Sequence, residues 1–240
     1  MLSIKDVTLN LPDKENLINK ISLDIRPGKL TVITGPNGGG KTSLAKLIAG
    51  LFVPTSGKIY LDDEDITDMS ITDRARRGIA FAFQQPVSFK GLKVKDLMEI
   101  AAGKNMSEIG MCAILEKVGL CAREYMNREM DSHLSGGEMK RIEIATVLSR
   151  PAKYVIFDEP EAGIDLWSFK SLIEAFKALK EEEERALLII SHQERILEIA
   201  DYIAVVEGGR ISAYGPGSEV LPGLIGGGYK AHCPKGKEMF

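Results

Sequence analysis

The sequence predicts an α/β fold built on a mainly parallel β-sheet that helices cover on both faces. Short β-branched or apolar runs predict strands at 30–35, 154–160, 186–191 and 202–209. Helical patterns near 165–180 and 193–200 separate the later strands. Strands that alternate with helices in this way are typical of a parallel sheet, because each crossover helix returns the chain to the same edge.

Two further segments predict smaller parts beside this sheet. The runs SIKDVTLNL, INKISLDI and GKIYLDD are closely spaced and partly alternating, which predicts a small antiparallel sheet. From about Pro86 to Leu134 the strands vanish and helical periodicity replaces them. We therefore expect one domain over 1–240, with a core at 1–85 and 135–215, a helical insert at 86–134 and a C-terminal tail at 216–240.

Bulk composition limits the possible function classes. Apolar residues make up 44% of the 240 residues and charged residues 27%, which fits a packed core. The net charge of -3, from 31 basic and 34 acidic residues, argues against broad nucleic-acid binding. No apolar run reaches the roughly 18 residues of a membrane span, and the N-terminus lacks a signal-peptide pattern. We expect a cytoplasmic protein, not inserted in a membrane, whose cysteines (Cys112, Cys121 and Cys233) stay reduced.

The stretch GPNGGGKTSL lies between a predicted strand and a predicted helix and fits the phosphate-loop pattern G-x-x-x-x-G-K-[ST]. Its glycines let successive N–H groups point at anionic oxygens, and the helix adds its positive end. Lys41 is expected to reach the β- and γ-phosphates, and the Thr42 hydroxyl to bind Mg²⁺. The expected contacts with a nucleoside triphosphate are Gly35, Pro36, Asn37, Gly38, Gly39, Gly40, Lys41, Thr42 and Ser43.

Two carboxylates close the predicted strand YVIFDEP. Asp158, at the strand end, is expected to hold Mg²⁺. Glu159 lies one residue further on and is expected to act as the general base that polarises the attacking water. The sequence therefore predicts hydrolysis of the nucleotide in addition to binding.

Two more polar side chains follow predicted strands. His192 comes after ALLIIS, at the edge of the sheet where ligands bind, and is expected to sense the γ-phosphate. Gln84 follows IAFAF and is expected to contact Mg²⁺ or the attacking water. Both are therefore counted with Glu159 as catalytic candidates.

The stretch HLSGGEMKRIEIATVLSRP predicts a second anion cradle. Its N–H groups and the Ser135 hydroxyl open a helix about 95 residues after the phosphate loop. Because one nucleotide needs only one phosphate loop, a second cradle makes sense if it closes over the nucleotide of another subunit.

These motifs resemble those of the ATP-binding cassette (ABC) ATPases. The phosphate loop, Gln84, LSGGE, VIFDEP, the turn from Gly163 to Asp165 and His192 follow the family order over nearly the whole chain. The resemblance implies an ATP-dependent head-to-tail homodimer with two ATP molecules at the interface. It assigns dimer contacts to Gly163 and Asp165, and contacts in trans to Ser135, Gly136, Gly137 and Glu138. The family's adenine-stacking aromatic residue is missing, because its position corresponds to Leu11.

Within this family, MLSIKDV, FQQPVSF and SHQERIL are similar to the SufC branch, the ATPase subunits of SUF iron–sulfur cluster assembly. This similarity implies a SufB/SufD-like soluble scaffold as partner. Glu161 departs from the serine or threonine of many relatives.

Other functions stay open. The alternative is the ATPase subunit of an ABC membrane importer, although PVSFKGLKV lacks an importer-like pattern. A chromosome or repair clamp would need a long coiled coil after the phosphate loop, and no heptads occur there. A translation ATPase would normally carry two cassettes.

Overall fold

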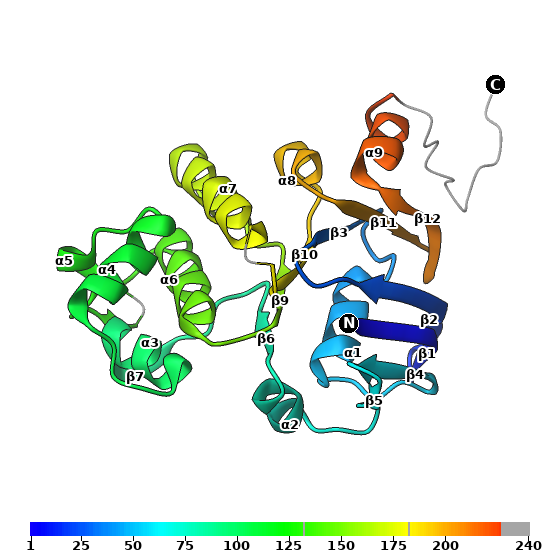
Figure 1. Cartoon of the computed structure of the whole chain (residues 1–240), viewed down its shortest axis with the longest axis horizontal. Helices are drawn as coiled ribbons and strands as arrows, with labels where there is room; N and C mark the ends of the chain where they lie inside the picture. The colour runs from blue at the N-terminus through cyan, green and yellow to red at the C-terminus, as the bar shows by residue number, and fades with distance from the viewer. Residues whose placement is uncertain (132, 182, 227–240) are drawn as a thin grey trace.

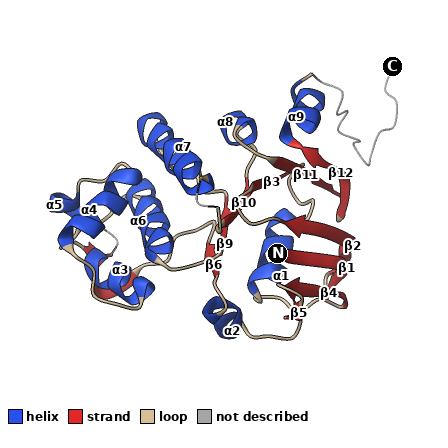
Figure 2. Cartoon of the chain, in the orientation of Figure 1, coloured by secondary structure: helices blue, strands red, loops and turns tan. Residues whose placement is uncertain are grey.

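The structure is a computed structural model that describes residues 1–131, 133–181 and 183–226. Its main sheet has six strands in the order β12-β11-β3-β10-β9-β6, and only β12 runs antiparallel to its neighbour. The strands are β3 (Leu30–Thr34), β6 (Ile79–Ala82), β9 (Tyr154–Asp158), β10 (Ala186–Ile190), β11 (Tyr202–Glu207) and β12 (Arg210–Pro216). The predicted α/β fold with a mainly parallel sheet is confirmed (Figure 2).

Strand register brings the carboxyl ends of the central strands together. Ile190, the last residue of β10, pairs with Ile33 of β3 on one side and with Asp158 of β9 on the other. All residues of these three strands are buried, which explains their unbroken apolar pattern. The loops after β3, β9 and β10 therefore leave the sheet side by side.

The two faces of the main sheet pack into different hydrophobic clusters. Val32, Phe157 and Ile189 face a cluster formed with the helices α6 (Gly136–Ser149), α7 (Leu166–Lys180) and α8 (Glu194–Glu198). Ile33, Ile156 and Leu188 face a second cluster formed with α1 (Lys41–Ala49) and the antiparallel sheet. Alternation along each strand thus covers both faces of the sheet.

The antiparallel sheet has the order β2-β1-β4-β5. Its strands are β1 (Leu2–Leu11), β2 (Lys14–Ile25), β4 (Ser56–Leu61) and β5 (Glu64–Asp65), which include the three runs expected from the sequence. In Figure 1 this sheet and the green helical part lie at opposite ends of the molecule.

The helical part contains α3 (Val94–Ala102), α4 (Glu108–Lys117) and α5 (Ala122–Tyr125). It also contains two short paired strands, β7 (Phe89–Lys93) and β8 (Glu129–Met130), where the sequence predicted only helices. Four of the five β7 residues are exposed, so no buried alternating pattern marks this strand.

The segment expected as a C-terminal tail begins with a helix, α9 (Gly217–Ile225). Residues 227–240, including Cys233, lie outside the described residues. Cys112 and Cys121 are exposed free thiols. Within the described residues, no helix combines the length and apolar character needed to cross a membrane.

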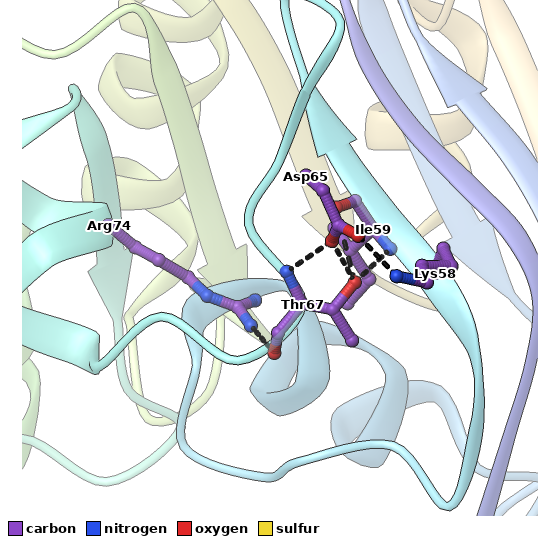
Figure 3. Close-up of polar contacts among 5 residues, drawn as sticks. All are labelled: Lys58, Ile59, Asp65, Thr67 and Arg74. Carbon is purple, nitrogen blue, oxygen red and sulfur yellow. Dashed lines mark hydrogen bonds and ion pairs between the residues drawn. The ribbon is translucent and has the colours of Figure 1, made fainter.

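Arg74 fastens the end of α1 to the loop before α2 (Ile71–Arg76). Its guanidinium is buried and donates to Leu47 O (2.7 Å) and Ile48 O (2.9 Å) in the last turn of α1. It also donates to Thr67 O at 2.7 Å, and Figure 3 shows Thr67 held in turn by Asp65. A cation at a helix C-terminus is favourable because the last carbonyls have no partner inside the helix.

Candidate nucleotide-hydrolysis site

The predicted phosphate loop joins β3 to α1, and its backbone requires glycine at two positions. Gly35 has a φ of 127°, and a Cβ there would lie 2.2 Å from Val206 O. Gly40 has a φ of 105°, and a Cβ there would lie 2.8 Å from Leu17 O. Among the described residues, no side chain caps the N-terminus of α1, so its first N–H groups are available to an anion.

Lys41 folds back over the phosphate loop. Its ammonium donates to Gly35 O at 2.8 Å and to Pro36 O at 2.9 Å. Burial lowers the pKa of Lys41, and the nearby Glu159 and Asp158 carboxylates oppose that shift. The cation therefore lies against the loop carbonyl groups and near two carboxylates, the predicted general base Glu159 and the predicted metal ligand Asp158.

Thr42 and Asp158 form a paired oxygen site. The Thr42 hydroxyl donates to Asp158 Oδ1 at 3.1 Å, which joins the first turn of α1 to the end of β9. Burial raises the pKa of the Asp158 carboxyl, and the bond from Thr42 opposes the shift. Hydroxyl and carboxylate oxygens are hard ligands of the kind that Mg²⁺ prefers, so these residues fit a magnesium ion bound together with phosphate oxygens.

Gln84 and Glu159 meet directly. Gln84 Nε2 donates to Glu159 Oε2 at 2.6 Å. Glu159 has a φ of 46°, which is unusual for a residue with a side chain, and its N–H donates to Ile190 O at 3.0 Å. The two residues come from loops after β6 and β9, which are neighbouring strands in the sheet.

Gln84 and Glu159 line one cavity of about 340 Å³ together with Lys41 and Thr42. Its walls are Lys14, Leu17, Asn37, Gly38, Gly40, Lys41, Thr42, Ser43, Gln84 and Glu159. No aromatic side chain is among these described wall residues, as expected from the sequence. However, Leu17 and Lys14 of β2 line the cavity, whereas Leu11 does not. Lys14 Nζ also reaches Gly38 O at 3.3 Å.

Sequence reasoning missed Lys14 and Leu17 because their position depends on the β1–β2 pairing. That pairing contains several register shifts, including one between Leu9 and Leu11. Only the folded hairpin brings Leu17 beside Gly40.

His192 does not line the cavity of Gln84 and Glu159 but a neighbouring one of about 650 Å³, which Pro36 and Asn37 of the phosphate loop also line. Burial and the positive charge of Lys41 lower the pKa of His192, whereas Glu159 opposes the shift. The imidazole therefore favours its neutral form, in which one ring nitrogen donates a hydrogen bond and the other accepts one.

Glu161 ties the loop after β9 to the loop that carries His192. Ser191 Oγ donates to Glu161 Oε1 at 2.5 Å and accepts from Gln193 N at 3.0 Å. Burial raises the pKa of Glu161, and its second carboxylate oxygen is buried without a hydrogen-bond partner. The departure from serine or threonine at this position thus creates a contact that flanks His192.

The predicted signature forms the N-terminus of α6. Ser135 is the N-cap, and its hydroxyl accepts from Glu138 N at 3.2 Å. The Glu138 carboxylate accepts from Ser135 N at 2.7 Å and from the Tyr125 hydroxyl, and these bonds lower its pKa to about 2. The carboxylate expected to contact ATP in trans is therefore engaged within its own chain, as in a capping box.

The signature residues do not line either cavity beside the phosphate loop of their own chain. Gly137 packs instead on the turn expected to form dimer contacts, since a Cβ on Gly137 would lie 2.7 Å from Gly163 O. Asp165 caps α7 by accepting from Trp167 N and Ser168 N, each at 3.0 Å. One chain thus brings together the phosphate loop, Gln84, Asp158, Glu159 and His192, while the signature lies apart from them.

A strand, phosphate loop and helix beside an acidic pair define the class of phosphate-loop nucleoside triphosphatases. The family model described as "ABC transporter" matches residues 18–162. An uncharacterized ABC transporter ATP-binding protein of Methanocaldococcus jannaschii is 34% identical over 243 residues, covering 98% of this chain and 94% of the relative. The chain belongs to the ABC transporter ATP-binding family, and it is an ATPase.

Two further relatives are both described as probable ATP-dependent transporters. The probable ATP-dependent transporter SufC of Escherichia coli is 31% identical over 226 residues, covering 88% of this chain and 90% of the relative. The probable ATP-dependent transporter ycf16 of Antithamnion sp. is 31% identical over 245 residues, covering 95% and 96%. The predicted similarity to SufC is confirmed.

Solved structures agree on the fold. A nucleotide-free ATP-binding cassette from an ABC transporter matches with a TM-score of 0.82 at 23% identity, covering 99% of both chains. A dimeric bacterial ABC transporter cassette matches with a TM-score of 0.80 at 23% identity, covering 90% of this chain and 98% of the other. ABC cassettes of this fold therefore include dimers.

Proposed function

We propose that this chain is the Mg-ATP-hydrolysing subunit of an iron–sulfur cluster assembly machine, in which ATP-driven dimerisation changes the conformation of a soluble SufB/SufD-like scaffold in the cytoplasm. The observation that best supports ATP hydrolysis is the 2.6 Å hydrogen bond between Gln84 and Glu159, at the cavity that Lys41 and Thr42 also line. A carboxylate and an amide at this position can orient water against a phosphate chain.

The position of each residue supports the catalytic role that we propose for it. Lys41 and the free N–H groups of α1 bind the β- and γ-phosphates. Glu159 takes up the proton of the attacking water, while Gln84 and His192 orient water and γ-phosphate. Mg²⁺, when bound by Thr42, Gln84 and Asp158, supplies neutralisation of the charge that develops on the phosphate oxygens.

The signature acts on the nucleotide of the second subunit. Ser135, Gly136 and Gly137 present the N-terminus of a 14-residue helix, which attracts an anion. In this proposal Glu138 keeps the Ser135 backbone in place through the capping box rather than touching ATP itself. The turn with Gly163 and Asp165 lies at the dimer interface.

An apolar groove beside Gln84 supports a protein partner. Its volume is about 210 Å³, and its walls include Phe81, Phe83, Val87, Phe89 and Val147. Val87 and Phe89 are also exposed on the surface, where apolar side chains typically mark an interaction site. The SufC and ycf16 relatives, together with the FQQPVSF and SHQERIL stretches, favour a scaffold of the SUF type as occupant.

Replacement of the general base tests the hydrolysis. In Glu159→Gln we expect turnover to fall by roughly 10²- to 10⁴-fold, the usual scale for a lost general base. ATP binding should persist, and the protein should form a stable ATP-bound dimer on size-exclusion chromatography. Lys41→Ala is the matched control, because it should weaken ATP binding itself. Near-normal turnover of Glu159→Gln would contradict the assignment.

The partner is tested by co-purification from the native host. A tagged protein from an anaerobic lysate without detergent should elute with a soluble β-rich protein, identified by mass spectrometry, with iron assayed in parallel. A multispan membrane protein that appears only after detergent is added would favour the importer subunit instead.

A further inference from the structure

Lys140 is a buried charged residue to which the reaction above gives no role. It lies in the second turn of α6, and its side chain has 0% exposure. Its ammonium donates to Phe83 O, to Gln84 O at 3.3 Å and to Glu143 Oε2 at 3.2 Å. A lysine has three donors, so every one of them has a partner, as burial of an ammonium group requires.

Glu143 holds the same segment from the other side. Its Oε1 accepts from Phe83 N at 2.8 Å, while its Oε2 accepts from Lys140. The N–H and the C=O of Phe83 are therefore both bound by side chains of α6. Phe83 and Gln84 follow the last residue of β6 and belong to no helix or strand, so these side chains replace the missing ladder bonds.

Gln84 thus links the Lys140–Glu143 pair to the carboxylate of Glu159. The backbone of Gln84 is held by Lys140, and its side chain donates to Glu159 at 2.6 Å. α6 and β6 pack together. The same helix begins at Ser135, so the signature and Gln84 are fixed to one rigid element.

We propose that Lys140 and Glu143 are positioning residues that set Gln84, and through it Glu159, for hydrolysis. The proposal rests on the role of Gln84 given above. Glu143 and Phe83 also line the apolar groove, so an occupant of the groove contacts one member of the pair directly.

The test removes both charges together, so that no buried charge is left unpaired. In Lys140→Met/Glu143→Gln, methionine keeps the chain length without a donor, and glutamine keeps an acceptor for Phe83 N. We expect kcat for ATP to fall about ten-fold, because a displaced catalytic group loses its alignment. The KM and the affinity for ADP should stay at wild-type values, because neither residue lines the nucleotide cavity.

A double-mutant cycle separates positioning from general destabilisation. In a Gln84→Ala background, removal of the pair should cause no further loss of kcat, because its effect passes through Gln84. Lys177→Met/Glu174→Gln is the matched control, since this pair also has i, i+3 spacing at 3.0 Å but is exposed. Glu143→Asp keeps the buried charge pair but shortens the side chain that holds Phe83 N, so it should also slow turnover, which gives a second variant if the double variant unfolds.

Three results would overturn the inference. One is an unchanged kcat in folded Lys140→Met/Glu143→Gln while Gln84→Ala is slow, which would leave the role of Gln84 intact. Another is a loss that adds fully to that of Gln84→Ala. Wild-type turnover of Gln84→Ala itself would contradict both the proposed role of Gln84 and the positioning.

Discussion

Glu159, the proposed general base, has an unusual backbone conformation. Its φ of 46° lies in the left-handed region, which costs about 1 kcal/mol or more for a residue with a Cβ. The bond from its N–H to Ile190 O holds this conformation against the end of β10. The strained residue is thus fixed by the same sheet edge that carries Asp158 and the loop to His192.

At the same scale, His192 should titrate below pH 6.5. Its pKa is lowered by burial and by Lys41, so the folded protein takes up this proton at lower pH than the unfolded chain. Above pH 6.5 both states are neutral and His192 has no effect on stability. As the pH falls below 6.5 the unfolded state is protonated first, and stability decreases.

NMR of the imidazole C–H signals measures this midpoint directly, because the chain has only three histidines. His192→Gln identifies the signal by its loss. His133 is the internal comparison: it is exposed and bonded to Asp131 at 2.8 Å. A His192 midpoint at or above 6.5 would contradict the environment described here.

At the scale of elements, Arg74 should stabilise the joint between α1 and α2. In Arg74→Met, the carbonyl oxygens of Leu47, Ile48, Thr67 and Met69 each lose the donor that Arg74 supplies, and only Leu47 O keeps a second one, Gly50 N at 3.2 Å, among the bonds of the described residues. We expect the free energy of unfolding to fall by about 3 kcal/mol, on the scale of buried acceptors left without partners. Urea denaturation measures the change.

Arg76→Met on the same helix is the control. Arg76 is exposed and lies 3.7 Å from Asp73, so its loss should change stability by less than about 0.5 kcal/mol. Equal effects of the two substitutions would show that the carbonyl contacts of Arg74 contribute nothing.

Strands and helices could be predicted from the sequence where their burial requires a regular pattern of apolar residues. β3, β9 and β10 are buried on both faces and read as unbroken apolar runs. β7 is exposed and contains Gly91, and α9 contains Pro222, so neither carries its usual signal. Both depend on contacts with distant segments.

The candidate site likewise has residues that local sequence predicts and residues that only tertiary contacts bring to it. The phosphate loop and Asp158–Glu159 are contiguous motifs, so their chemistry could be assigned from residue order. Leu17 enters the cavity only through hairpin register, and Lys140 is a charged residue that normally predicts a solvated face. These two positions depend on tertiary contacts that no local pattern encodes.

At the scale of the whole molecule, Trp167 should report closure of the proposed dimer. It is the only tryptophan in the sequence, it is 83% exposed, and it follows Asp165 by two residues. If the turn from Gly163 to Asp165 meets a second copy, Mg-ATP should shift the emission of Glu159→Gln to shorter wavelength. Lys41→Ala should show no shift. An unchanged emission from a dimer seen by chromatography would place Trp167 outside the interface.

A mixture of two inactive variants tests whether the site is shared between chains. Lys41→Ala removes the phosphate-loop cation, and Ser135→Arg blocks the anion cradle at the start of α6. A mixed dimer then contains one composite site with both defects and one with neither, because each site takes its loop from one chain and its signature from the other. Mixing should therefore restore activity up to one working site per dimer, measured as ATP turnover against mixing ratio. Activity that never rises above that of the separate variants would contradict this geometry, as would full activity at two sites.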